Sequence, residues 1–124
     1  MKKLLVLVVV LILIGAASWA QGSMGTGQWL HDFWTSYQKV KINQTSTPSD
    51  TMDAVEYMGF VEGAGRVMQD AGWLDLTRIT YGQQFAVVGK YLEDHPEQWN
   101  LRAEVSVFWA LYAVWPGTEV SPYR

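Results

Sequence analysis

The stretch at residues 100–116, NLRAEVSVFWALYAVWP, carries the strongest helical pattern in the chain. Its large apolar residues follow a 4-3-4-3 spacing that places them on one face of a helix: Leu101, Val105, Phe108, Tyr112 and Trp115. Asn100 is expected to cap the start of this helix, and Pro116-Gly117 to stop it. Such an apolar face requires other helices to cover it.

Two helices are expected earlier in the chain. Residues 27–41 have apolar side chains at intervals of three and four, which predicts one wide apolar stripe. After a polar loop, Ser49 or Asp50 is expected to cap a second helix that ends near Gly72. Its expected core face contains Met52, Val55, Met58 or Gly59, and Val61, and continues toward Met68. Its charged residues Asp53, Glu56 and Glu62 are expected on the opposite side.

The remaining helix is expected to begin at a capping box formed by Thr80 and Gln83. It carries Phe85, Val88 and Leu92 on one face and ends before Pro96. The connection at residues 73–79 is unusually apolar for a loop. No strand is expected, because an extended stretch at residues 77–81 would lack a partner for its backbone. The sequence therefore predicts an all-α fold, a compact irregular bundle of four to six helices.

The N-terminus has the layout of a secretory signal peptide. Two lysines follow Met1, residues 4–14 are uninterruptedly apolar, and small residues precede a cleavage point expected between Ala20 and Gln21. An uncleaved membrane anchor is the alternative. Cleavage removes 20 of 124 residues and leaves 104 as a single domain, residues 21–124, in the periplasm. It also removes two lysines and no acidic residue, so the formal net charge moves from -3 to -5.

Composition excludes several kinds of site. The chain has no cysteine, so disulfides, cysteine-ligated metals and a cysteine nucleophile are all excluded. An acidic chain of this size is a poor candidate for binding nucleic acid. The 49% hydrophobic and 14% aromatic content supports a packed core without disulfides. No cofactor or metal is expected.

Few residues in the chain suggest catalysis. His31 is interpreted as part of a solvated helix edge, and His95 as a residue that suits the open carbonyls of a helix end. An acidic cluster of Glu93, Asp94 and Glu97 leaves open a small carboxylate-dependent or metal-assisted cell-wall hydrolase. A helical adaptor without a hydrolase partner is also open. Binding is the default interpretation of an exported helical domain with this composition.

Three stretches together resemble the Rap/Tai-type immunity proteins of type VI secretion systems. They are YMGFVEG at residues 57–63, TYGQ at residues 80–83 followed by VVGKYLEDHPE at residues 87–97, and ALYAVWP at residues 110–116. The family pattern has a Gly-Tyr-Ile-x-Gly run, a Gly-Gln that enters a helix closing with Tyr-Leu-x-x-His-Pro-Glu, and a final helix ending in Trp-Pro-Cys. The match spans about residues 27–117.

The resemblance implies a periplasmic helical protein that is not an enzyme. Such proteins bind a peptidoglycan amidase effector and occlude its active site, some of them as dimers, so a homodimer is among the assemblies to expect. No membrane contact is expected after signal cleavage. Family members carry cysteines where this chain has Tyr57, Leu74 and Gly117. The resemblance is thus to a cysteine-free, divergent member in which Tyr57 and Leu74 are expected to replace covalent links by packing.

The residues expected to contact a partner come from the loop after the second helix. Trp73, Asp75 and Arg78 combine an aromatic anchor with charge on a loop that can enter a cleft, and Glu62 on the second helix is expected to support them. The family motif does not assign these contacts. Trp99, which also falls between helices, is a second candidate for an exposed indole.

Overall fold

A computed structural model describes residues 25–42 and 44–124, and the expected signal peptide lies outside these residues. The described chain is all-α, as predicted. It contains four α-helices, α2 (Gly27–Lys41), α3 (Pro48–Asp70), α4 (Tyr81–Asp94) and α5 (Ala103–Tyr112), and one 3₁₀ turn, η1 (Pro96–Gln98). No helix among the described residues is both long and apolar enough to span a membrane.

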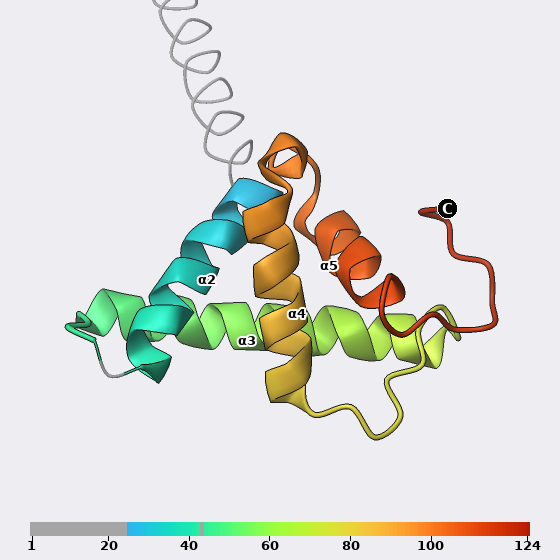
Figure 1. Ribbon diagram of the computed structural model, residues 1–124, viewed down its shortest axis with the longest axis horizontal. Coiled ribbons are helices and arrows are strands. Elements are labelled where there is room, and N and C mark those ends of the chain that lie inside the picture. The colour runs from blue at the N-terminus through green and yellow to red at the C-terminus, as the bar shows by residue number, and fades with distance from the viewer. Residues whose placement is uncertain (1–24, 43) are drawn as a thin grey trace, which may run out of the picture.

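The longest helix, α3, is covered on one side. Figure 1 shows α2 and α4 crossing one side of α3 and α5 beside them, and all three helices contact α3. The core lies between these layers and is dominated by large side chains that are 0–1% exposed: Leu30, Tyr57, Val61, Val88, Leu92, Phe108 and Leu111. The opposite side of α3 stays open to solvent.

Several local predictions are confirmed. The first helix spans Gly27–Lys41 as expected. Thr80 and Gln83 form the capping box of α4, and Gly72 follows α3 with a φ of +77°. In the described part of the chain, extended pairing is limited to two isolated bridges, Thr26 with Arg102 and Leu74 with Pro116.

The predicted core face of α3 is partly wrong. Met52 and Val55 are 69% and 58% exposed, whereas Ala54 and Tyr57 face the core. The buried set has its own three-and-four spacing, Ala54, Tyr57, Val61, Gly65 and Met68. The buried face of α3 carries the large Tyr57 side chain together with two small residues, Ala54 and Gly65, that let neighbouring helices come close.

Both predicted caps outside α4 need correction. Thr47 caps α3, and Asp50 returns the interaction as the third residue of a capping box, so neither Ser49 nor Asp50 is the cap. The α5 helix starts after Arg102 without a side-chain cap, so Asn100 does not cap it. Instead the Ala103 N–H donates to the Gly25 carbonyl at 2.6 Å, so tertiary contact replaces the local cap.

The predicted stripe on the last helix is also only partly right. Phe108 is fully buried, but Leu101 lies outside the helix and is 40% exposed. The helix ends at Tyr112, before Pro116. It buries Val107, Ala110 and Leu111 as well, because α5 packs against more than one neighbour and needs apolar residues on more than one face.

Tyr57 provides a pH-dependent test of the core. Its hydroxyl donates to the Phe85 carbonyl at 2.7 Å. Burial, then the nearby Tyr37 and Glu93, raise the pKa of Tyr57 far above its usual 10.0. The unfolded chain therefore releases this proton above about pH 10 while the folded chain keeps it, so stability present below pH 10 is lost as the pH rises further.

Replacing Tyr57 by Phe should make this alkaline loss of stability shallower, by up to about 1.4 kcal/mol per pH unit. Near neutral pH the same variant should lose about 1 kcal/mol, because the hydrogen bond is gone. Urea unfolding at pH 8, 10 and 11 measures both effects. Parallel pH dependences for the two proteins would contradict the buried position of Tyr57.

Candidate functional site

The connection between α3 and α4 is a loop tied to the core at several points. Figure 1 shows it extending away from the helices between the end of α3 and the start of α4. Leu74 and Leu76 are buried, at 2% and 5% exposure. The backbone of Asp75 donates to the Trp115 carbonyl at 3.0 Å, and Gly117 donates to the Trp73 carbonyl at 2.9 Å. The C-terminal tail thus holds the loop in one position.

The outer part of this loop presents charged side chains. Asp75, Thr77 and Arg78 are exposed. The Thr77 N–H donates to Asp75 Oδ1 at 3.2 Å, and hydrogen bonds from Thr77 hold the pKa of Asp75 below its usual value, so this carboxylate is charged at neutral pH. Arg78 has a φ of +67°. For a residue with a side chain this left-handed conformation costs on the order of 1 kcal/mol.

The left-handed Arg78 leads to a paired prediction. Arg78→Gly should leave the free energy of unfolding within about 1 kcal/mol of the parent, because relief of strain offsets the extra freedom of glycine in the unfolded chain. Arg78→Val should instead destabilise by about 1–2 kcal/mol, because a β-branched residue tolerates this conformation poorly. Thermal denaturation of both variants measures the difference. Equal stabilities would contradict the left-handed loop.

The four residues predicted to contact a partner do not form one patch. Asp75 and Arg78 lie on the exposed loop, whereas Trp73 is half-buried against Tyr123, with ring centroids 5.9 Å apart. Trp73 also lines an apolar groove of about 480 Å³ on the side of α3. Glu62 is half-buried on α3 and is not among the residues that line this groove. Asp75 and Arg78 thus share an exposed loop, whereas Glu62 lies on α3, outside the groove that Trp73 lines.

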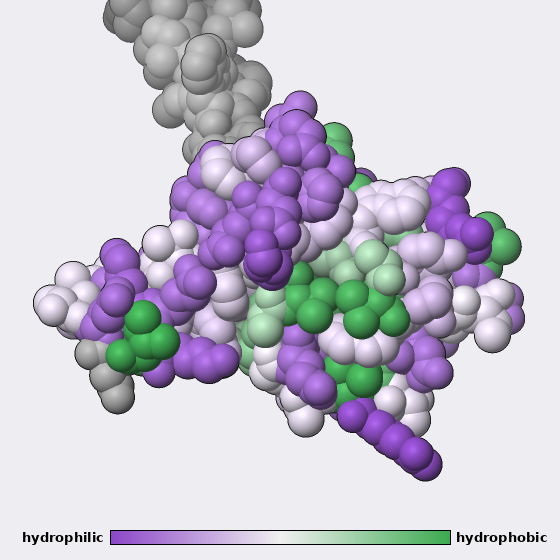
Figure 2. All heavy atoms as spheres, viewed as in Figure 1, coloured by the Kyte–Doolittle hydropathy of each residue, from purple (hydrophilic) through white to green (hydrophobic). Residues whose placement is uncertain are grey.

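A second apolar groove lies between α4 and α5. Figure 2 shows hydrophobic side chains gathered where these two helices lie side by side. The groove has a volume of about 390 Å³, and its apolar lining includes Val87, Ala110 and Val114. Val114 is 51% exposed. The small side chains of α5 let the two helices approach and leave this shallow depression open.

The acidic cluster is divided among separate partners. Glu93 accepts a hydrogen bond from the Trp34 indole at 2.8 Å, and Asp94 pairs with Lys90. Glu97 interacts with His95 at 2.9 Å, and this contact holds the pKa of Glu97 below its usual value. In the described part of the chain no group of three His, Asp or Glu residues could hold a metal ion. The geometry gives the three carboxylates separate structural roles.

His31 and Trp99 differ from their sequence interpretations. The His31 ring stacks on Trp99 with centroids 4.2 Å apart, so it is not part of a solvated edge. Its Nδ1 is buried without a hydrogen bond, 3.9 Å from Asp32. The Trp99 indole donates to the Leu92 carbonyl at 2.8 Å. Trp99 is therefore a fixed, half-buried side chain that joins α2 to the end of α4.

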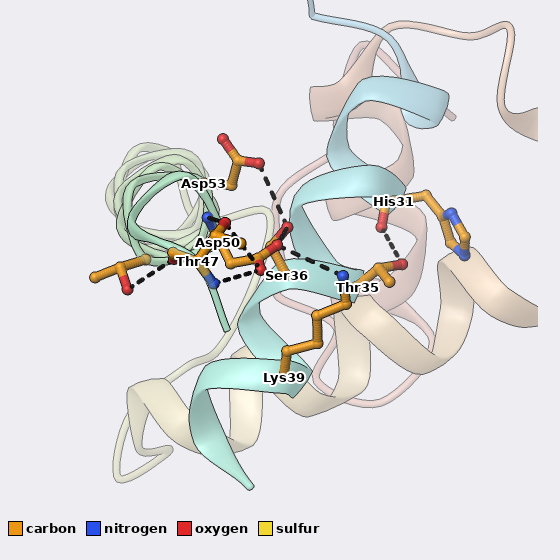
Figure 3. A network of polar contacts seen from close by, with 8 residues as sticks. His31, Thr35, Ser36, Lys39, Thr47, Asp50 and Asp53 are labelled. Carbon is orange, nitrogen blue, oxygen red and sulfur yellow. Dashed lines mark hydrogen bonds and ion pairs between the residues drawn. The ribbon is translucent and has the colours of Figure 1, made fainter. Parts of the chain in front are cut away.

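Sequence reasoning missed a polar network that joins α2 to the start of α3 (Figure 3). Ser36 is 6% exposed and donates to Asp50 at 3.1 Å, with a longer contact to Asp53 at 3.4 Å. Lys39 lies 3.6 Å from Asp50. Bonds from Thr47, then from Ser36, hold the pKa of Asp50 low. The Thr-x-x-Asp spacing at residues 47–50 was the available signal, and the network stabilises the fold.

Leu74 and Gly117 lie side by side. Leu74 forms the isolated bridge with Pro116, and a Cβ atom added to Gly117 would overlap the Gly72 carbonyl and the backbone of Trp73 and Leu74. Tyr57 lies apart from them in the core and is fully buried. Two of the three positions at which the resemblance places cysteines are thus adjacent in space.

Comparisons of the chain with family models, curated proteins and solved structures give no match.

Proposed function

We propose that this chain is a periplasmic immunity-type protein that inhibits a peptidoglycan amidase delivered by type VI secretion. The loop at residues 73–80 enters the amidase cleft and keeps the cell wall out of it. Asp75 and Arg78 make the charged contacts. Trp73 holds the base of the loop in place. Glu62, which lies on α3, makes at most a peripheral contact with the amidase.

The observation that carries this proposal is the preorganised loop. Leu74 and Leu76 anchor it in the core, backbone bonds from the C-terminal tail hold its base, and Arg78 is kept in a left-handed conformation. Strained backbone on an exposed loop is typical of functional segments. A loop already held in its bound shape loses little conformational entropy on binding, which raises affinity without adding contacts.

The target class depends on the sequence resemblance. Leu74 and Gly117 are adjacent, but a Cβ atom on Gly117 would overlap the backbone of residues 72–74, so their adjacency adds nothing to the resemblance. This chain has buried Leu74 and a backbone bridge to Pro116 at this place. Burial of Leu74 and Tyr57 agrees with the expected replacement of covalent links by packing.

Charge supports a basic target. The chain carries 12 acidic against 9 basic residues, and the expected cleavage makes it more acidic. Complementary charge speeds the encounter of two proteins, and the gain weakens as salt rises. A basic hydrolase is therefore the partner that this domain would meet fastest.

The homodimer belongs to the same proposal, through the open side of α3. Val55 and Val67 are exposed there, and a Cβ atom on Gly59 or Gly63 would meet nothing within 4 Å. These four residues form one row at intervals of four. Antiparallel pairing about a twofold axis near the centre of the row places each valine opposite the other valine of the partner copy, and Gly59 opposite the partner's Gly63.

Charge exchange tests this dimer. Val55→Lys with Val67→Lys should place like charges opposite one another and shift the chain toward monomer, whereas Val55→Lys with Val67→Glu should pair opposite charges across the axis and keep the dimer. The two residues are twelve positions apart on one helix and do not meet within a single copy. Sedimentation velocity measures the populations. A monomeric parent, or two double variants that are equally monomeric, would contradict the proposed interface.

The function is tested by the release of soluble fragments from purified peptidoglycan. The full chain should release none, and it should suppress release by a small type VI amidase in proportion to its concentration. A cell-wall hydrolase would release fragments unaided, and an adaptor would leave every amidase active. Either result would overturn the proposal.

A further inference from the structure

A groove at the start of α2 is separate from the proposed inhibitory loop. It has a volume of about 670 Å³ and is lined by Trp29 and Trp99 together with four polar side chains, Gln28, Asp32, Glu97 and Asn100. The lining residues come from α2 and from the η1 turn and the segment after it, so the fold and not the sequence brings the two indoles together.

Both indoles are held in place. Trp29 contacts Phe33 at 4.6 Å and Phe60 at 5.4 Å between ring centroids. His31 covers one face of Trp99, and the Trp99 N–H is bonded to the Leu92 carbonyl, so a ligand can stack only on the opposite face. Aromatic rings fixed in this way offer apolar contact area at little entropic cost.

The charge of the groove and the hydrogen bonds at its edge disfavour anionic ligands. No Lys or Arg is among the groove-lining residues of the described chain. The first N–H groups of α2 are already used: Gly27 donates to the Leu101 carbonyl, Gln28 to the Trp99 carbonyl and Leu30 to the Thr26 carbonyl. A phosphate or other anion would therefore meet two carboxylates, and the side-chain donors that Gln28 and Asn100 offer it are neutral amides.

We infer that this groove binds a neutral oligosaccharide. A sugar ring has an apolar face of C–H groups that suits an indole, and a rim of hydroxyls that both donate and accept. Asp32 accepts from the Gln28 amide at 2.8 Å and Glu97 interacts with His95 at 2.9 Å. Both carboxylates keep further lone pairs that can accept from sugar hydroxyls, and the Asn100 amide can both donate and accept. This combination of aromatic surface and a few convergent polar groups is typical of a small-molecule site. The inference does not depend on the proposed inhibition.

The test is a titration of the full chain with the trisaccharide of N-acetylglucosamine, followed by calorimetry and by NMR of the indole N–H groups. We expect saturable binding that moves the Trp29 and Trp99 signals and leaves that of Trp73 in place. Asp32→Ala and Asn100→Ala, both at exposed side chains, should each weaken binding by roughly tenfold. Asp70→Ala, an exposed acidic residue outside the groove, is the control and should bind like the parent.

Three results would overturn the inference. The first is the absence of saturable trisaccharide binding by a chain whose circular dichroism shows it to be folded. The second is binding that Asp32→Ala and Asn100→Ala leave unchanged, which would place the sugar elsewhere. The third is a tetralysine peptide that moves the Trp29 and Trp99 signals when the trisaccharide does not, which would make the groove a site for cations.

Discussion

Gly89→Ala is expected to destabilise the protein by about 3 kcal/mol and to lower its melting temperature by about 15 °C. A Cβ atom at this position would overlap the Trp34 ring. The ring cannot move aside freely, because it is 7% exposed, donates to Glu93 at 2.8 Å and stacks on Tyr37 at 5.5 Å. The added methyl must therefore displace the ring or separate α4 from α2.

Gly82, which also lies on α4, provides the control position for Gly89→Ala. Gly82 is exposed, and a Cβ atom there would have its nearest neighbour at 3.9 Å, an ordinary contact. Gly82→Ala should therefore leave stability unchanged or raise it by up to about 1 kcal/mol, because alanine favours the helix. Thermal denaturation compares the two variants. A Gly89→Ala protein as stable as Gly82→Ala would contradict the close packing of Trp34 on α4.

The second large effect is expected on inhibition. Changing Asp75 to Asn and Arg78 to Glu together should weaken inhibition of the target amidase by about 100-fold, because both charged contacts at the loop tip are lost. Stability should change little. Asparagine can still accept from the Thr77 N–H, and the Arg78 side chain is exposed. Inhibition constants and melting temperatures are measured on the same samples.

A matched control carries the same change in net charge away from the loop. Asp70→Asn with Lys41→Glu alters two exposed residues, and this pair should inhibit like the parent apart from a small gain in the association rate, because the chain becomes one unit more acidic. If the control loses as much inhibition as the loop variant, net charge rather than the loop determines binding. That outcome would remove Asp75 and Arg78 from the proposed contact.

The sequence correctly predicted those features of the fold that depend on interactions between residues close together in the chain. The first helix, the capping box at Thr80 and the glycine after α3 were all predicted, because each depends on neighbours within about one helical turn. The face of α3 and the start of α5 were not. Which face of α3 is buried depends on where α2, α4 and α5 cross it, and α5 begins where Gly25, far away in sequence, accepts a bond from Ala103.

The candidate sites likewise contain some features that the sequence predicted and others that it did not. The apolar content of residues 73–79 pointed to an anchored loop, and Leu74 and Leu76 are buried. The left-handed Arg78 had no signal, because arginine has no preference for that conformation. The groove between Trp29 and Trp99 was also beyond sequence reasoning, since its two indoles are separated by 70 positions and meet only in the folded chain.

The central claim is that the folded domain presents a binding surface and performs no reaction itself. The most direct measurement is the rate of fragment release from purified peptidoglycan by type VI amidases, with and without the full chain, over a range of chain concentrations. The account predicts no release by the chain alone and saturable suppression of one amidase, relieved by the Asp75 and Arg78 double variant. Release by the chain alone, or full activity of every amidase at saturating chain, would contradict it.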